Sequence, residues 1–209
     1  MNARKWMSLA AGVAGMAVAW CGPGTARAAE PLWLGEEEES VAVLALIPGD
    51  EVVYAGGVLQ ECVGLDVPVK VYLFTTEASA AQAATDALEA LELPPDTLVL
   101  LDDAVTQLAP ALAAQSPTLV VVSPELAEPA SPLHEAMAGL PPALVLAGIA
   151  PGETDREADM EFELVEPQQE AKEAALAAYD LGGAEAQERF QRVQLAPAQR
   201  PQPPAAVLP

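Results

Sequence analysis

Basic residues are scarce in this chain of 209 residues. Lys and Arg number 9 against 31 Asp and Glu, which gives a formal net charge of -22 at pH 7. Binding to phosphate backbones and anionic lipid surfaces depends on Lys and Arg. The shortage therefore excludes nucleic acid as a partner, and a cation or a basic protein is the kind of partner that such a surface attracts.

Histidine and the common catalytic motifs are scarce as well. The single histidine, His134, is followed by Glu135, but Ala138 stands where the zinc motif H-E-x-x-H requires a second histidine. Neither a G-x-x-x-x-G-K-[ST] phosphate loop nor a G-x-S-x-G nucleophile turn occurs. These absences predict no catalytic residue and no resident cofactor, with a divalent cation such as calcium or magnesium left as an open alternative.

The N-terminus has the pattern of a secretory signal peptide over residues 1–28. Basic residues at positions 4 and 5 precede an uncharged apolar run, Trp6–Trp20, and Ala26-Arg27-Ala28 matches an A-x-A cleavage site. The run is shorter than the roughly 20 residues that cross a bilayer, so we expect an exported protein, periplasmic or extracellular, with no membrane span after cleavage. Lipid attachment at Cys21 is an alternative.

Cleavage removes three basic residues and no acidic one, so the net charge becomes -25. The remaining cysteine, Cys62, has no partner for an intramolecular disulfide. Stability must therefore come from a core. The chain is 52% hydrophobic and only 4% aromatic, which is typical of a folded domain with an aliphatic core and not of a disordered acidic chain.

Five short segments are apolar almost throughout, which is typical of parallel strands covered by helices on both faces. They are Val41–Ile47, Val67–Phe74, Thr97–Leu101, Thr118–Val122 and Ala143–Ala147.

Helical spacing separates these strands. Apolar residues at steps of three and four predict helices over 52–64, 78–93 and 105–112, and Ser131 caps a fourth helix. The alternation predicts an α/β fold of three layers: a doubly wound, mostly parallel five-stranded sheet between helices. In outline it resembles the flavodoxin-like folds.

The pattern changes after Pro151. Met160–Val165 alternates apolar and acidic residues, which predicts an antiparallel edge strand, and helices are predicted over 168–179 and 184–193. The predicted divisions are the signal peptide at 1–28, an acidic segment at 29–40, a single α/β domain at 41–195 and an extended Pro-rich tail at 196–209.

Ligands of open parallel sheets bind beyond the carboxyl ends of the strands. The side chains predicted to bind a ligand there are Asp50, Asp102, Asp103, Glu125 and His134. The same positions begin helices, where carboxylates also cap free N–H groups, so a purely structural role is the alternative, and it is favoured for Asp103.

The missing motifs favour an exported, non-enzymatic α/β domain that acts as a ligand-binding or accessory protein of the cell envelope, with a small ligand or a basic protein as partner. The first alternative is a small extracytoplasmic metal-dependent hydrolase, in which Asp50 and Asp102 hold the metal and His134 is the acid or base. The second is an acidic partner of a basic redox or surface protein.

Overall fold

The computed structural model describes residues 28–32, 34, 40–128, 131, 143–153 and 155–194, with the backbone alone at 104 and 105. Residues 1–27 of the predicted signal peptide, which include Cys21, lie outside these residues, as do His134, the Pro-rich tail and the helix predicted after Ser131.

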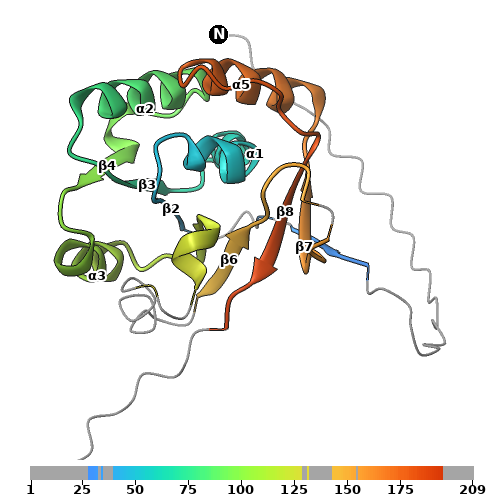
Figure 1. Cartoon of the computed structure of the whole chain (residues 1–209), viewed down its shortest axis with the longest axis horizontal. Coiled ribbons are helices and arrows are strands. Elements are labelled where there is room, and N and C mark those ends of the chain that lie inside the picture. The colour runs from blue at the N-terminus through green and yellow to red at the C-terminus, as the bar shows by residue number, and fades with distance from the viewer. Residues whose placement is uncertain are drawn as a thin grey trace, which may run out of the picture.

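The fold is a mostly parallel sheet of eight strands, and not the predicted five with one edge strand, in the order β1-β7-β8-β6-β5-β2-β3-β4 (Figure 1). Antiparallel pairing is limited to β8, which lies between β6 and β7. The strands are β1 (Glu30–Pro31), β2 (Val41–Ala45), β3 (Val69–Phe74), β4 (Leu98–Leu101), β5 (Leu119–Val122), β6 (Leu144–Gly148), β7 (Met160–Glu163) and β8 (Gln187–Arg192).

Helices cover both faces of this sheet, which confirms the predicted three-layer α/β class (Figure 1). Along β2, Val41 and Val43 belong to the core beneath one helical layer, and Ala42 and Leu44 to the core beneath the other. Strands buried on both faces need apolar side chains at every position, which is why they are continuous apolar runs. The first layer contains α1 (Asp50–Leu65), α2 (Ala78–Ala90) and α5 (Glu166–Ala177), and the second contains α3 (Ala104–Gln115).

The predicted helix over 184–193 is wrong, because β8 occupies this segment. Glu188 and Phe190 are buried while their neighbours along the strand are exposed or half-buried, so the true period is two. A buried glutamate at one of the inward positions conceals that alternation in the sequence.

The predicted edge strand is also corrected. β7 is a strand, but it lies inside the sheet, between β8 and the short β1. Glu30 and Pro31 pair with Met160 and Glu161, so part of the predicted acidic segment at 29–40 belongs to the sheet.

The strand order reverses between β2 and β5. From β2 the chain moves outward through α1 and α2 to β3 and β4, and it then returns through α3 to β5 on the other side of β2. Such a topological switch point leaves a crevice at the carboxyl ends of the two central strands, where open α/β sheets bind ligands. Within the described part of the chain, no helix is long and apolar enough to cross a membrane.

Candidate functional site

Asp50 and Ser123 meet across the switch point. Asp50 is the first residue of α1, five residues after β2, and Ser123 directly follows β5. The Ser123 hydroxyl donates to Asp50 Oδ2 over 2.7 Å, and the Ile47 N–H donates to the same oxygen over 3.1 Å. Ser123 Oγ in turn accepts from the Leu46 N–H at 3.1 Å. The loops that follow β2 and β5 are thus joined through one carboxylate and one hydroxyl.

A buried carboxylate fixes the turn that presents Asp50. Gly49 has φ of 102°, a left-handed conformation that favours glycine, and its N–H donates to Glu51 Oε2 at 3.0 Å. The Tyr179 hydroxyl donates to Glu51 Oε1 from the segment after α5. Glu51 is fully buried, and the turn is therefore held from both sides.

Negatively charged side chains act on Asp50 and Tyr54 at this site. Burial raises the pKa of Asp50, an effect that its hydrogen bonds from Ser123 and Ile47 oppose and the charge of Glu125 reinforces. Tyr54 follows Asp50 by one turn of α1. Burial and the charges of Asp50, Glu125 and Glu153 raise the pKa of Tyr54 to about 12. The phenol therefore remains a protonated hydrogen-bond donor at neutral pH.

These carboxyl groups give stability a definite pH dependence. Burial raises the pKa values of Asp50 and Glu51 in the folded protein above the ordinary 3.8 and 4.5. Their contribution is fully present below those ordinary values and is lost as pH rises through the folded pKa values. We expect the free energy of unfolding, measured in urea, to be higher near pH 5 than near pH 7. Glu51→Gln should flatten this slope and the exposed control Glu89→Gln should not; a slope of opposite sign would contradict the assignment.

The other predicted ligand residues lie apart from Asp50, with one exception. Asp102 and Asp103 follow β4, which β3 separates from β2. Asp102 Oδ1 accepts from the Gln107 side chain at 2.5 Å, and Asp103 accepts from the Thr106 N–H at 3.3 Å as the N-cap of α3.

Glu125 is the exception. It lies in the 3-10 turn η2 (Pro124–Ala127), close enough to Asp50 for its charge to act on it. The structure therefore brings Asp50 and Glu125 together and leaves Asp102 and Asp103 two strands away, while His134 lies outside the described residues.

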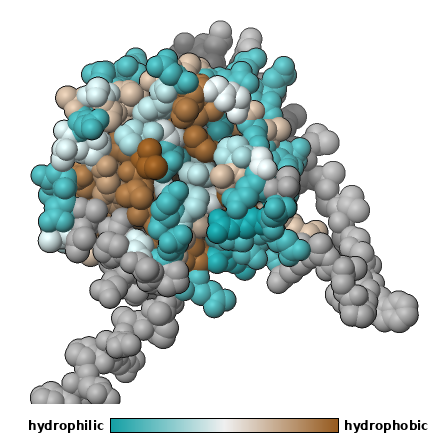
Figure 2. Space-filling model, viewed as in Figure 1, coloured by the Kyte–Doolittle hydropathy of each residue, from teal (hydrophilic) through white to brown (hydrophobic). Residues whose placement is uncertain are grey.

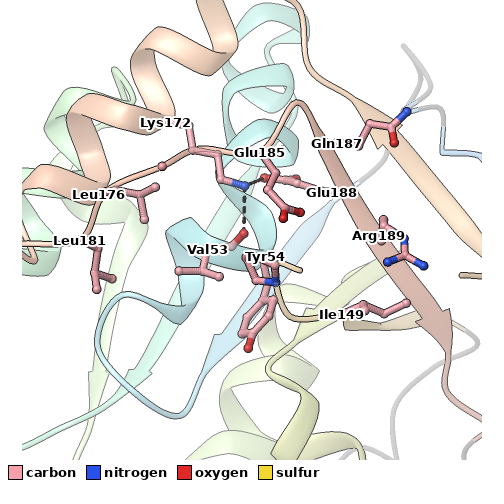
Figure 3. A pocket seen from close by; sticks show the side chains of 13 residues that line it. Val53, Tyr54, Ile149, Lys172, Leu176, Leu181, Glu185, Gln187, Glu188 and Arg189 are labelled. Carbon is pink, nitrogen blue, oxygen red and sulfur yellow. Dashed lines mark hydrogen bonds and ion pairs between the residues drawn. The ribbon is translucent and has the colours of Figure 1, made fainter. Parts of the chain in front are cut away.

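A cavity of about 140 Å³ opens beside the switch point, between α1, α5 and β8, and is called the α5 cavity (Figure 3). Tyr54 belongs to its wall, and its ring packs over Gly148 at the end of β6, where an added Cβ would lie 2.4 Å from Tyr54 Cδ1. Tyr54 is thus shared by the cavity and the carboxylates of the switch point.

An ion pair is buried in the wall of the α5 cavity. Lys172 Nζ lies 2.6 Å from Glu188 Oε1, and the two side chains are 3% and 1% exposed. Lys172 also donates to Val53 O at 2.9 Å, and Glu188 accepts the N–H groups of Gly57 and Val58 at 2.7 and 3.2 Å. In a regular helix, Val53 O and the Gly57 N–H are the acceptor and the donor of one i→i−4 bond. The Lys172–Glu188 ion pair therefore contacts α1 through the backbone of the helix. Burial raises the pKa of Glu188, and the charge of Lys172 opposes this.

Apolar side chains border the acidic site. Leu46, Ile47 and Leu181 are 36%, 54% and 44% exposed, and Leu181 Cδ1 lies 3.2 Å from the position that a Cβ on Gly49 would take. The face shown in Figure 2 has apolar areas set between hydrophilic ones. A ligand here would meet carboxylates and exposed aliphatic groups together.

The described residues do not form a complete metal site. Among them, no group of three or more His, Cys, Asp or Glu side chains is placed to hold a metal ion. At the switch point, Oδ2 of Asp50 already accepts two hydrogen bonds. Asp50 and Glu125 supply two carboxylates, fewer than the three protein ligands of a catalytic zinc site.

Comparison of the sequence with protein-family models and with curated proteins gives no match. Solved structures share the fold at low sequence identity. An N,N'-diacetylchitobiose deacetylase from Pyrococcus horikoshii, bound to an inhibitor, has a TM-score of 0.56 at 12% identity over 75% of this chain and 84% of its own. The zinc-inhibited form of the teicoplanin deacetylase Orf2 has a TM-score of 0.51 at 13% identity over 67% and 83%. GalB, the 4-carboxy-2-hydroxymuconate hydratase of Pseudomonas putida KT2440, has a TM-score of 0.51 at 14% identity over 80% and 100%.

These similarities define the chain as an α/β domain with the fold of these enzymes. They contradict the prediction of a non-enzymatic binding or accessory protein, because the neighbours that share this fold are named as enzymes. The prediction relied on missing sequence motifs, and short motifs do not report on sites assembled from several strand ends. The teicoplanin deacetylase was solved in a zinc-inhibited form, which leaves the predicted alternative of a divalent cation open.

Sequence reasoning missed the residues that surround Asp50 and the α5 cavity. The position of Ser123 beside β2 follows from a strand order that the sequence does not reveal. Nothing in the sequence marks Tyr54 as a site residue beyond its position in the predicted helix. Lys172 does carry one, since Lys70 and Lys172 are the two lysines after the predicted signal peptide.

Proposed function

We propose that this protein is a hydrolase whose reaction centre lies at the switch point, with Asp50 as the general base. The observation that carries the proposal is the Ser123–Asp50 hydrogen bond of 2.7 Å, which fixes a carboxylate at the ligand-binding edge of a doubly wound sheet. The structural neighbours named as deacetylases support it, and a deacetylase and a hydratase both add water to their substrates.

Asp50 has the properties of a base that activates water. A general base works best when its pKa approaches the working pH, and burial moves the pKa of Asp50 in that direction. Oδ2 is occupied by Ser123 and Ile47, whereas Oδ1 accepts no hydrogen bond from the described residues. The held oxygen fixes the orientation and the other is available to a water molecule.

The proposed reaction is hydrolysis of an acyl bond. Asp50 takes a proton from water as the water oxygen bonds to the acyl carbon, and the bond to the leaving nitrogen or oxygen then breaks with return of the proton to that atom. The Tyr54 hydroxyl, kept protonated by the surrounding carboxylates, donates to the acyl oxygen as negative charge develops on it.

A divalent cation belongs to this proposal as a variable of the experiment. The proposed reaction does not depend on it, since Asp50 and Glu125 supply two carboxylates, fewer than the three protein ligands of a catalytic zinc site. The export predicted from residues 1–28 is part of the proposal too, and it makes the substrate extracytoplasmic.

The test is release of carboxylic acid from a panel of short-chain N-acyl amines and O-acyl esters. The protein without residues 1–28 is assayed after EDTA treatment and again with added Zn²⁺, Mg²⁺ or Ca²⁺. We expect turnover of at least one acyl class, with a rate that rises as Asp50 deprotonates. Absence of hydrolysis for every substrate under every metal condition would overturn the proposal.

A further inference from the structure

We infer that the α5 cavity binds a small neutral acyl group, a carbonyl oxygen on a short apolar body, through the Lys172 ammonium. The inference rests on the proposed function in one respect: it identifies this group as the acyl part of the substrate. Binding itself requires no turnover and can be measured separately.

Lys172 has a hydrogen-bond donor to spare. Its ammonium carries three N–H groups, and two of them have partners, Glu188 Oε1 at 2.6 Å and Val53 O at 2.9 Å. The third has no partner among the described residues, although the side chain is only 3% exposed and belongs to the cavity wall. Figure 3 shows the amine reaching from α5 to the backbone of α1, beside Glu188 and Glu185. A buried donor without a partner is costly, and an oxygen acceptor in the cavity would satisfy it.

The rest of the wall suits a short aliphatic body. Val53, Ile149, Leu176 and Leu181 contribute apolar surface. A volume of about 140 Å³ is close to that of engineered cavities of about 150 Å³ that hold one benzene molecule, so the ligand has about six non-hydrogen atoms.

Charge favours a neutral acceptor over a carboxylate. The charges in the wall balance, since Lys172 and Arg189 are matched by Glu185 and Glu188. Arg189 is already engaged, because its guanidinium donates to the backbone oxygens of Glu153 and Arg156, each at 2.7 Å. Asp50, Glu125 and Glu153 act on Tyr54 in the cavity wall, and their negative charges disfavour an anion there.

The position of the cavity fits a substrate pocket. Tyr54 lines it and lies one turn of α1 after Asp50, so an acyl group held by Lys172 meets the residue that donates to the acyl oxygen in the proposed reaction.

The experiment compares three near-isosteric probes, butanamide, butanoate and n-butylammonium, by titration into ¹⁵N-labelled protein lacking residues 1–28, followed by NMR. We expect butanamide to perturb the amides of Val53 and Leu176 with a dissociation constant of roughly 1 mM and the two charged probes to bind at least about tenfold more weakly. Equal or tighter binding of butanoate would overturn the inference.

Variants test whether butanamide binds in the α5 cavity and through Lys172. Lys172→Met combined with Glu188→Leu removes the donor without leaving a lone buried charge, and Leu181→Trp fills the mouth from an exposed loop position. Each should weaken butanamide at least about tenfold, whereas Lys70→Met, which changes a solvent-accessible lysine, should leave it unchanged. Unchanged binding in Leu181→Trp contradicts the cavity as the site, whether or not the double variant folds.

The two proposals fail separately. Asp50→Asn should retain butanamide binding and lose turnover. Binding of butanamide without any hydrolysis would contradict the proposed function and leave the α5 cavity as a binding site. Hydrolysis with an unchanged KM in Leu181→Trp would contradict the α5 cavity as the acyl site and leave the proposed hydrolase function intact.

Discussion

Asp50→Asn is expected to lower kcat/KM for the best acyl substrate by about two to four orders of magnitude, the range typical of losing a general base. Asparagine has nearly the same shape as aspartate, and its Oδ1 can accept the hydrogen bonds that Ser123 and Ile47 now donate to the carboxylate. Its amide nitrogen takes the place of the carboxylate oxygen that has no partner among the described residues. The turn is therefore retained while the basic site is removed.

The matched control is Asp102→Asn. Asp102 also follows the carboxyl end of a strand, is exposed, and accepts a hydrogen bond from the Gln107 side chain. Its substitution changes the net charge equally, so any effect of charge alone appears in both variants. The general-base role is refuted if both variants retain the parental rate, or if both lose it equally. Rescue of the truncated variant Asp50→Ala by small carboxylate buffers such as formate would support it.

The central strands could be predicted because each is a short run of apolar residues that the sequence shows directly. Leu119–Val122 has only four residues, but it is buried on both faces and contains no polar residue. The helices between strands were visible for the same reason, since each buries one stripe. Cys62 lies on that stripe of α1 and is 1% exposed.

Strand order could not be predicted, and the site depends on it. Carboxylates follow both β2 and β4, and the sequence gives no reason to prefer Asp50 over Asp102. The order β5-β2-β3-β4 places Ser123 and Glu125 beside Asp50 and leaves Asp102 at the far edge. That order is set by long-range packing, which no local pattern records.

The segment 184–193 was predicted as a helix because a charged residue of the strand β8, Glu188, is buried. A glutamate at an inward position of a strand, as at Glu188, is rare unless a cation accompanies it. That cation, Lys172, lies on a different element 16 residues earlier. The alternation of buried and exposed residues in β8 can be recognised only when Glu188 is known to pair with Lys172.

Lys172→Met is expected to lower the free energy of unfolding by about 3–5 kcal/mol, as is typical when one partner of a buried ion pair is removed. Glu188 would remain 1% exposed with a charge that only the N–H groups of Gly57 and Val58 stabilise. Urea denaturation measures the change as a lower midpoint at unchanged slope. Because the stranded carboxyl group gains stability by binding a proton, the loss should shrink as pH falls.

Lys172→Met combined with Glu188→Leu should recover most of that loss, because two apolar side chains of similar volume replace the pair. Val53 O and the N–H of Gly57 would both be released, and they are one acceptor and one donor four residues apart in α1. They are i→i−4 partners within the continuous helix α1, so neither group is left unsatisfied. Lys70→Met, at a solvent-accessible pair with Asp96, should change stability by no more than about 1 kcal/mol. A double variant as unstable as Lys172→Met would show that the cost lies in lost packing between α5 and α1, and not in the stranded charge of Glu188.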